Sequence, residues 1–226
     1  MFGETMIPFA KIQKAAEKRL GAAALAARLP KVKSPAALKK VSDDRYLSLM
    51  SLRIFRAGLK HEMVDAKWPA FEKVFNGFDP KRVRAMSDET IEKLMGDARV
   101  IRHLGKLKSV PANAAAICDV AAEHGSVGAW LADWPGSDIV GLWDALAKRF
   151  NQMGGNSGPY FLRMAGKDTF IFTPAVVKGM NHWGAFDGEP KGKAARAKVA
   201  GIFNEWAEAT GLPLAHLSMM LAVSLD

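Results

Sequence analysis

Apolar residues recur every three or four positions along most of the chain, and this spacing is typical of one face of an α-helix. The clearest example runs from Tyr46 to Phe55, where apolar residues lie almost all round the predicted helix. Ser42 is suited to cap this helix, and Asp43 and Asp44 suit the positive end of its dipole. Because a helix that is apolar all round is buried, we expect this helix to form the centre of the core.

Further helices are predicted wherever the same spacing is bounded by capping residues, prolines or glycines. The predicted segments are 8–28, 69–78, a helix from Ser87, another from about residue 99, 111–125, 126–135, a helix from Asp138 to Gly154, a short helix from Pro159, a helix from Pro174, a basic helix over 191–209 and a last helix from about Pro213. Only residues 169–173 are briefly strand-like, and no unit repeats at a fixed period. The pattern therefore predicts an all-α protein.

The composition is that of a globular chain that can bury a full core. Of the 226 residues, 49% are hydrophobic and 24% are charged, and this length fits one large domain or two small lobes. No apolar run reaches the roughly 18 residues that a bilayer span needs. Residues 1–20 are amphipathic, whereas a secretion signal would be continuously apolar. We therefore expect a cytoplasmic protein that does not bind membranes.

The charge balance points toward a polyanionic partner. The formal net charge is +9, from 32 Lys and Arg against 23 Asp and Glu. Such a charge lowers the cost of approaching phosphates, although many basic proteins bind no nucleic acid. The single cysteine, Cys118, excludes an internal disulfide and every multi-thiolate metal site. Its setting among alanines predicts a small buried side chain.

A glycine-rich loop joins two predicted helices at residues 153–160. Glycines permit positive φ angles and close backbone approach, and a helix start with outward N–H groups can hold one phosphate without reading sequence. The competing interpretation is a plain turn whose glycines only end the preceding helix, flanked by a solvated basic face. The predicted DNA-binding residues are Gly154, Gly155, Asn156, Ser157, Gly158 and Tyr160, with Lys148, Arg149 and Arg163 adding charge.

Two parts of the chain, taken together, resemble a known family. The first contains Asp43-Asp44-Arg45-Tyr46-Leu47, Arg56-Ala57-Gly58-Leu59, Phe71-Glu72-Lys73-Val74-Phe75, Phe78-Asp79-Pro80 and Ile101-Arg102-His103-Leu104-Gly105-Lys106. The second is the loop at 153–160, followed by Pro174-Ala175-Val176-Val177. In residue types and spacing, residues 41–112 resemble the DNA-3-methyladenine glycosylase I family of the helix-hairpin-helix glycosylase superfamily. The loop extends the resemblance to about residue 180.

The resemblance implies a two-lobed, all-helical helix-hairpin-helix fold. It also implies a protein that kinks duplex DNA, anchors a phosphate on the hairpin and hydrolyses the N-glycosidic bond of a flipped-out, alkylated purine. The expected partner is double-stranded DNA with a damaged base, which would place the protein on the nucleoid, and no obligate protein partner is inferred. Residues 1–40 are interpreted as an N-terminal helical extension and residues 41–226 as the glycosylase-like domain.

Two substitutions separate the chain from the family's pattern. The pocket glutamate of the family falls on Arg53, and the tryptophan that follows the Ala-Gly-Leu turn falls on His61. A carboxylate can hydrogen-bond a cationic methylated base and stabilise a developing oxocarbenium ion, whereas an arginine repels a positive base. The family's zinc ligands fall on Ala175 and Gly179, so we expect no metal and no other cofactor.

The predicted catalytic residues are Glu62, His61 and Arg53. A buried Glu62 beside His61 could be tuned toward catalysis, although a solvent-facing helix acid is the commoner case. The general acid of other superfamily members falls near Thr173, which is better suited to cap the next helix and cannot act as a base at neutral pH. Asp168 and Asp187 are weaker candidates.

Several other residues have a functional and a structural interpretation. His182 and Trp183 follow the hairpin and could stack on a displaced base or wedge the duplex, or Trp183 could pack in the core. In the family's signature, His103 is predicted to be buried with a hydrogen bond to the backbone, and Arg102 to tie helices together. Lys106 is predicted to face a phosphate, as is Lys108.

Three hypotheses of function remain. The first is a glycosylase that removes a modified base through a pocket lined by Arg53, His61 and Glu62, where an arginine and a histidine suit a neutral or acceptor-rich base. The second is a catalytically silent module that binds kinked or lesion-bearing DNA through the same hairpin. The third is a helical domain with no role on DNA.

Overall fold

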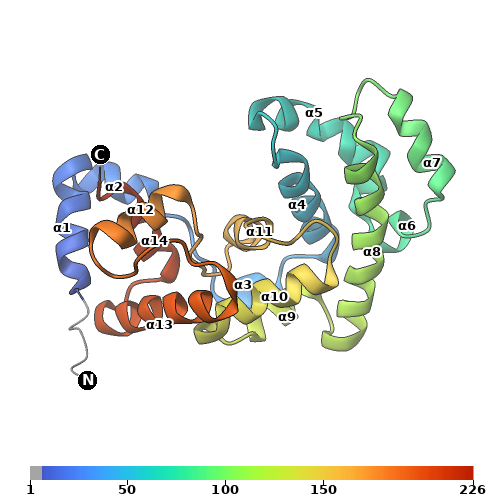
Figure 1. Ribbon diagram of the computed structural model, residues 1–226. Helices are drawn as coiled ribbons and strands as arrows, with labels where there is room; N and C mark the ends of the chain where they lie inside the picture. The colour runs from blue at the N-terminus through green and yellow to red at the C-terminus, as the bar shows by residue number, and fades with distance from the viewer. Residues whose placement is uncertain (1–6, 226) are drawn as a thin grey trace. The chain divides into compact units, whose positions relative to one another are not determined.

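The computed structural model describes residues 7–225, and its regular structure is helical throughout this range (Figure 1). The α-helices are α1 (Phe9–Leu20), α2 (Ala22–Arg28), α3 (Pro35–Lys39), α4 (Asp43–Arg56), α5 (His61–Val74), α6 (Pro80–Val83), α7 (Asp88–Lys93), α8 (Leu104–His124), α9 (Val127–Asp133), α10 (Ile139–Arg149), α11 (Ser157–Ala165), α12 (Pro174–His182), α13 (Gly192–Thr210) and α14 (Leu214–Val223). Short 3-10 helices are η1 (Asn76–Phe78), η2 (Leu94–Gly96) and η3 (Gly136–Asp138). No strand occurs between residues 7 and 225, so the all-α prediction is confirmed.

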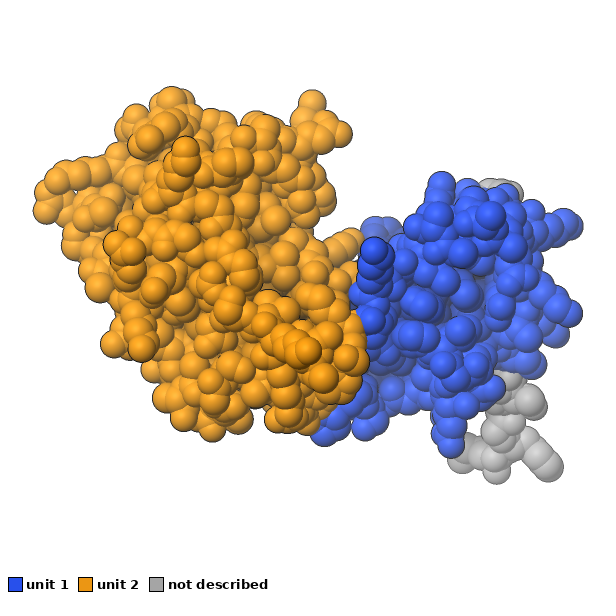
Figure 2. All heavy atoms as spheres, turned by 180° about the vertical axis from the view of Figure 1, so that it is seen from behind, with its two compact units in different colours: residues 1–32, 135–141, 168–226 blue, residues 33–134, 142–167 orange. Residues whose placement is uncertain are grey.

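The chain divides into two compact units (Figure 2). Unit 1 comprises residues 1–32, 135–141 and 168–226, and unit 2 comprises residues 33–134 and 142–167. Unit 1 therefore combines the two ends of the chain, whereas unit 2 holds its middle. The domain boundary predicted near residue 40 stays a prediction.

Unit 2 is built around α4. This helix buries residues on most of its surface, including Tyr46, Leu47, Met50 and Phe55, and it packs against α5, α8, α9 and α11. The buried Tyr46 hydroxyl donates to the Leu38 carbonyl at 2.9 Å, which ties α4 to α3. The prediction that this helix forms the centre of a core is confirmed for unit 2.

Unit 1 is built around α14, which packs against α1, α12 and α13. The Asp168 carboxylate accepts hydrogen bonds from the backbone N–H groups of Leu214 and Ala215 at 2.9 and 2.8 Å, so it caps the start of α14. Asp168 was a weak catalytic candidate in the sequence, and this structural role accounts for its carboxylate.

Two prolines that were predicted to begin helices lie inside them instead. Pro69 lies within α5, which already begins at His61, and Pro111 lies within α8, which begins at Leu104. A proline inside a helix removes one backbone hydrogen bond and strains the preceding turn, which is why it is normally interpreted as a boundary. In both helices the turns on either side continue across the proline.

Other boundaries were wrong by a few residues. The helix predicted over 8–28 is divided in two at Gly21, the helix predicted to reach Gly154 ends at Arg149, and the next begins at Ser157 and not at Pro159. Residues 169–173 form no strand. The predicted caps by Ser87 and Thr173 are confirmed, because each side chain accepts a hydrogen bond from a backbone N–H three residues on.

Within residues 7–225, no helix combines the length and the apolar character that a membrane span requires.

Candidate functional site

A cavity of about 560 Å³ opens in unit 2 where α4 ends and α5 begins. The last turn of α4 supplies Arg53 and Arg56, the following turn continues to Lys60, and His61 begins α5. Tyr160, from the first turns of α11, completes the lining. The structure thus brings together three residues, Arg53, His61 and Tyr160, that the sequence placed in two separate functional groups.

Arg53 is held in this cavity without an acidic partner. Its guanidinium carbon lies 4.6 Å from the centroid of the Tyr160 ring, a cation–π contact. Its Nε is buried and has no hydrogen-bond partner, and across residues 7–225 no carboxylate forms an ion pair with it. Burial lowers the pKa of Arg53 below its ordinary value; the interaction with Tyr160 opposes this shift, and the neighbouring Arg56 adds to it. An arginine in this state is available to a ligand.

Arg56, in contrast, is fully engaged by one carboxylate. Its Nε and Nη2 donate to the two oxygens of Asp65 at 2.8 and 2.6 Å. These hydrogen bonds lower the pKa of Asp65, so this carboxylate stays ionised and bound to Arg56. Asp65 is therefore not available as a general base for the cavity.

Lys106 does not have the position predicted for a phosphate contact. The residue is 7% exposed, and its Nζ donates to the carbonyls of Ala57 at 2.6 Å and Phe55 at 3.3 Å. Burial lowers the pKa of Lys106, and the charge of Arg53 lowers it further. The ammonium satisfies the carbonyls at the C-terminal end of α4, so it fixes the turn that forms the rim of the cavity. Lys108, the other lysine predicted there, pairs with Glu92 at 2.8 Å.

Glu62 lies outside the cavity. It is an exposed residue in the first turn of α5, directly after His61, and it is not part of the lining. None of the lining residues within the described range carries a carboxylate. Between residues 7 and 225, no three His, Cys, Asp or Glu side chains come together in a way that could hold a metal ion.

The glycine-rich hairpin joins α10 to α11, and its tip is exposed. Gly154, Gly155 and Asn156 are exposed, and Gly155 has a φ of 57°. The turn is held against α8, because the buried Asn113 accepts from the N–H of Asn151 at 2.7 Å and donates to its carbonyl at 3.2 Å. The hairpin is therefore a fixed turn with an exposed tip.

The remaining hairpin residues are less exposed than its tip. Gly158 is buried, its N–H donates to the Met153 carbonyl at 3.1 Å, and a Cβ at this position would lie 3.0 Å from that carbonyl oxygen. Ser157 and Arg163 are half-buried, and Tyr160 lines the Arg53 cavity. Of the predicted DNA-binding residues, the tip glycines and Asn156 are thus the ones most open to a phosphate.

His182 and Trp183 lie in unit 1, at the end of α12. The half-buried Trp183 donates from Nε1 to the hydroxyl of Ser224 at 2.9 Å, which favours the packing interpretation over a DNA wedge. His182 is exposed, and its ring centroid lies 5.2 Å from that of Trp183.

The family signature at Arg102 and His103 has a different local role from the one predicted. Both residues are exposed, and His103 is the N-cap of α8, where its Nδ1 accepts from the N–H of Lys106 at 3.3 Å. The predicted backbone hydrogen bond is present, but the prediction that His103 is buried was wrong. A histidine immediately before a long helix can serve as a cap without burial.

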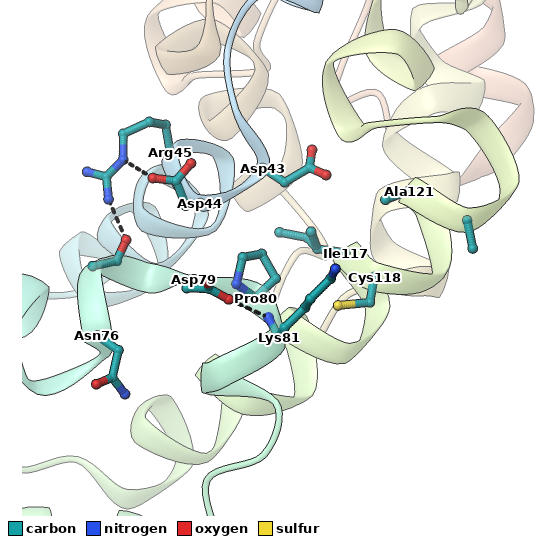
Figure 3. A pocket seen from close by; sticks show the side chains of 12 residues that line it. Asp43, Asp44, Arg45, Asn76, Asp79, Pro80, Lys81, Ile117, Cys118 and Ala121 are labelled. Atoms are coloured by element: carbon teal, nitrogen blue, oxygen red, sulfur yellow. Dashed lines mark hydrogen bonds and ion pairs between the residues drawn. The ribbon is translucent and has the colours of Figure 1, made fainter.

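A second, larger cavity of about 800 Å³ lies at the other end of α4 (Figure 3). Cys118 lines it and is half-buried, so the prediction of a buried thiol was wrong. Its charged residues serve the fold: Asp43 accepts from the N–H of Val127 at 2.8 Å, and Arg45 binds both Asp44 and the main chain of Gly77. The side chains in this cavity that carried the family resemblance therefore position helices.

Sequence reasoning missed two features of the smaller cavity. Tyr160 was assigned to the phosphate contact and lies against Arg53, and Lys106 was assigned to a phosphate and supports the rim. Lys106 and Phe55 are 51 positions apart, so no local pattern joins them. The proximity of Arg56 and Lys60 to the cavity follows directly from their adjacency to the Ala57-Gly58-Leu59 turn.

Comparison with known proteins identifies a family. The family described as methyladenine glycosylase matches residues 37–151. DNA-3-methyladenine glycosylase 1 of Escherichia coli (strain K12) is 41% identical over 77 residues, which cover 34% of this chain and 41% of that protein. The chain thus matches less than half the length of this curated relative.

Solved structures share the fold over larger parts of the chain. A crystal structure of 3-methyladenine DNA glycosylase I aligns with 64% of this chain and 86% of its own, at 23% identity and a TM-score of 0.50. The 8-oxoguanine glycosylase/lyase of Methanocaldococcus jannaschii, solved with DNA containing 8-oxoguanine, aligns with 93% of each chain at 13% identity and a TM-score of 0.55. The 8-oxoguanine DNA glycosylase of Thermotoga maritima aligns with 94% of this chain and 95% of its own, at 17% identity and a TM-score of 0.54. The fold is that of the all-helical DNA glycosylases.

Proposed function

The chain belongs to the methyladenine glycosylase family, and from this premise we propose its function. It binds duplex DNA that contains a damaged base and hydrolyses the N-glycosidic bond of that base once the base has left the stack. The observation that carries this proposal is the cavity at the end of α4, where Arg53, His61 and Tyr160 meet. This cavity stands at the position that the resemblance assigns to the base pocket.

Support for DNA binding comes from the hairpin and from the charge. The exposed tip at residues 154–156 presents backbone without large side chains, and such a turn can approach a phosphate closely. The net charge of +9 favours the approach to DNA. Lys148, exposed at the end of α10, adds charge beside the hairpin.

Hydrolysis breaks the bond between the sugar C1′ and the base nitrogen. The electron pair stays with the base, the sugar becomes an oxocarbenium ion, and water captures it and loses a proton. Arg53 and His61 line the cavity and can donate hydrogen bonds to the departing base. Glu62 is the predicted acid that lies nearest to His61 along the chain. It is exposed, so solvent screens its charge as it does that of an ordinary surface carboxylate.

One observation favours a second candidate function. Among the described residues no carboxylate lines the cavity, so none of them can act there as an acid that stabilises the oxocarbenium ion or as a base that activates water. A module that binds a damaged or kinked duplex without excising a base needs only the hairpin and the cavity. This alternative shares the DNA-binding half of the proposal and differs in the chemistry.

An excision assay separates the two candidates. Duplexes that carry an alkylated, a deaminated or an oxidised base are incubated with the protein, treated with alkali and resolved on a denaturing gel. We expect the wild-type protein to give strand cleavage at one class of lesion. We expect the Arg53→Met variant to give none. Binding without cleavage of any duplex would establish the silent module and overturn the hydrolytic proposal.

A charge substitution at the hairpin tests the DNA contact itself. Gly154 is exposed, and a Cβ there meets no atom within 4 Å, so Gly154→Asp adds a negative charge without strain. Gly96→Asp is the matched control, because Gly96 is exposed and equally open. We expect Gly154→Asp to weaken duplex binding about 10-fold at low salt and Gly96→Asp to have much less effect. If the two variants weaken duplex binding equally, or if binding does not weaken with salt, the hairpin does not contact the DNA.

A further inference from the structure

We propose that Arg53 selects a neutral 6-oxopurine, with its O6 and a free N7, over a positively charged alkylated purine. This inference rests on the proposed function, and it names the substrate class of the same cavity. The matched family's name refers to methyladenine, so the inference gives this chain a different preference from the one that name describes.

The cavity is lined by positively charged side chains. Arg53, Arg56 and Lys60 line it, and Lys106 lies buried behind its rim. Within residues 7–225, Arg56 is the one lining cation that is joined to a carboxylate, through Asp65. A purine with a fixed positive charge would enter a site where positive charges outnumber negative ones, and this repulsion is strong in partly desolvated surroundings.

Arg53 also has unmet hydrogen-bonding capacity. A guanidinium presents its donors in a planar fork; its Nε is enclosed by the protein, but the residue lines the cavity, and across residues 7–225 no hydrogen bond or ion pair joins its terminal nitrogens to another residue. Leaving a charged donor unsatisfied costs stability, whereas an acceptor from a ligand restores the hydrogen bond. The O6 and N7 of a 6-oxopurine form a pair of acceptors that matches the fork of an arginine. A methyl group on N7 removes one of these acceptors and adds the charge.

The charge of the leaving group also differs between the two classes of purine. A purine that carries a positive charge departs as a neutral molecule when the C1′–N9 bond breaks. A neutral purine departs with the electron pair as an anion and later takes a proton from water, so its departure is aided by a nearby positive charge. Arg53 supplies that charge in the place where it develops. The arginine thus hinders a cationic substrate and assists a neutral one.

The test exchanges the charge at this position. Duplexes of one sequence carry hypoxanthine, 7-methylguanine or guanine at a single site, and dissociation constants are measured by fluorescence anisotropy. The wild-type protein binds the hypoxanthine duplex about 10-fold or more tightly than the 7-methylguanine duplex, and Arg53→Glu reverses that order. Arg84→Glu is the control, because Arg84 is exposed in unit 2, does not line the cavity, and gives the same change in net charge.

A second variant protects the test against a folding defect. Arg53→Gln keeps an amide that can hydrogen-bond and removes the charge, and it reduces the preference without reversing it. The inference is overturned if the wild-type protein prefers the 7-methylguanine duplex, or if Arg53→Glu and Arg84→Glu change the preference equally. Either result leaves the proposed function intact. Absence of salt-dependent binding to every duplex overturns the proposed function, and the inference falls with it.

Discussion

Helix α4 carries Arg45 in its first turn and Arg53 and Arg56 in its last turns, and Arg45 and Arg53 have opposite surroundings. At the first turn, Arg45 donates to both oxygens of Glu72 at 3.0 Å and to Asp44 at 2.8 Å. At the last turns, Arg53 contacts the ring of Tyr160 and has no ion pair within the described chain. Arg45, like Arg56, is satisfied by carboxylates of the protein itself, whereas Arg53 is left for a ligand to satisfy.

This difference distinguishes a charged residue that stabilises the fold from one that can bind a ligand. A buried donor without an acceptor lowers stability, and such violations are expected at functional sites. The chain places this cation where a cavity opens, and it stabilises the surrounding turn through another residue, Lys106. The comparison therefore predicts that stability depends on Arg45 and Lys106, whereas ligand binding depends on Arg53.

The largest loss of stability is expected in Lys106→Met. Methionine fills a similar volume but leaves the carbonyls of Phe55 and Ala57 without their donor in a buried place. We expect the free energy of unfolding to fall by about 2 kcal/mol. Urea unfolding followed by circular dichroism measures this, with Lys108→Met as the control, because Lys108 pairs with Glu92 at a more exposed position. Equal losses in the two variants would show that the rim does not need the buried ammonium.

A smaller loss is expected in Arg45→Met, and essentially none in Arg53→Met. The side chain of Arg45 is 45% exposed, so solvent screens its ion pairs and the loss should be about 1 kcal/mol. Arg53→Met removes an unsatisfied donor, so the free energy of unfolding should stay the same or rise slightly. The same unfolding experiment compares the two. If Arg53→Met is the more destabilising variant, the distinction between the two ends of α4 is wrong.

A pH effect is expected for Tyr46, which lies in the core of unit 2; the chain's other tyrosine, Tyr160, lines the cavity. Burial, with a smaller effect from Asp43, raises the pKa of Tyr46 to about 12. A raised pKa means that folding favours the neutral phenol, so this contribution to stability is complete below about pH 10 and is lost as the pH rises toward 12. In Tyr160→Phe, the tyrosinate absorbance should therefore appear with a midpoint near 12. A midpoint near the ordinary value of about 10 in a folded protein would show that Tyr46 is accessible to solvent.

The smallest effect is expected in Glu62→Gln. Because Glu62 is exposed and does not line the cavity, its removal should change the excision rate by less than about threefold. Glu89→Gln, at an exposed position in the first turn of α7, is the matched control. A loss of several hundredfold in Glu62→Gln alone would restore Glu62 as the general base that the sequence suggested.

Local signals in the sequence predicted much of the fold. Ser87 and Thr173 cap helices because their hydroxyls reach a backbone N–H three residues on, and such short-range rules are visible in a sequence. The same rules misplaced the starts of α5 and α8, because packing outweighed the usual preference of Pro69 and Pro111 for a helix start.

The candidate site was predicted in part. Arg53 and His61 were found through the family resemblance, which aligns them with the family's pocket glutamate and with the tryptophan after the Ala57-Gly58-Leu59 turn, and they do line one cavity. The contact of Tyr160 with Arg53 and the cap that Lys106 provides join segments far apart in the chain, and residue types alone do not reveal such pairings. That no described residue pairs with the half-buried Arg53 can likewise be seen only in the three-dimensional structure.

The most direct test of the account is a cycle that combines one change in the protein with one change in the DNA. Binding is measured for the wild-type protein and Arg53→Met, each with duplexes that contain hypoxanthine or its 7-deaza analogue, which lacks the N7 acceptor. The account predicts that loss of N7 weakens wild-type binding about 10-fold and leaves binding by Arg53→Met unchanged. Equal weakening of both proteins would show that Arg53 does not meet the base, and would contradict the account.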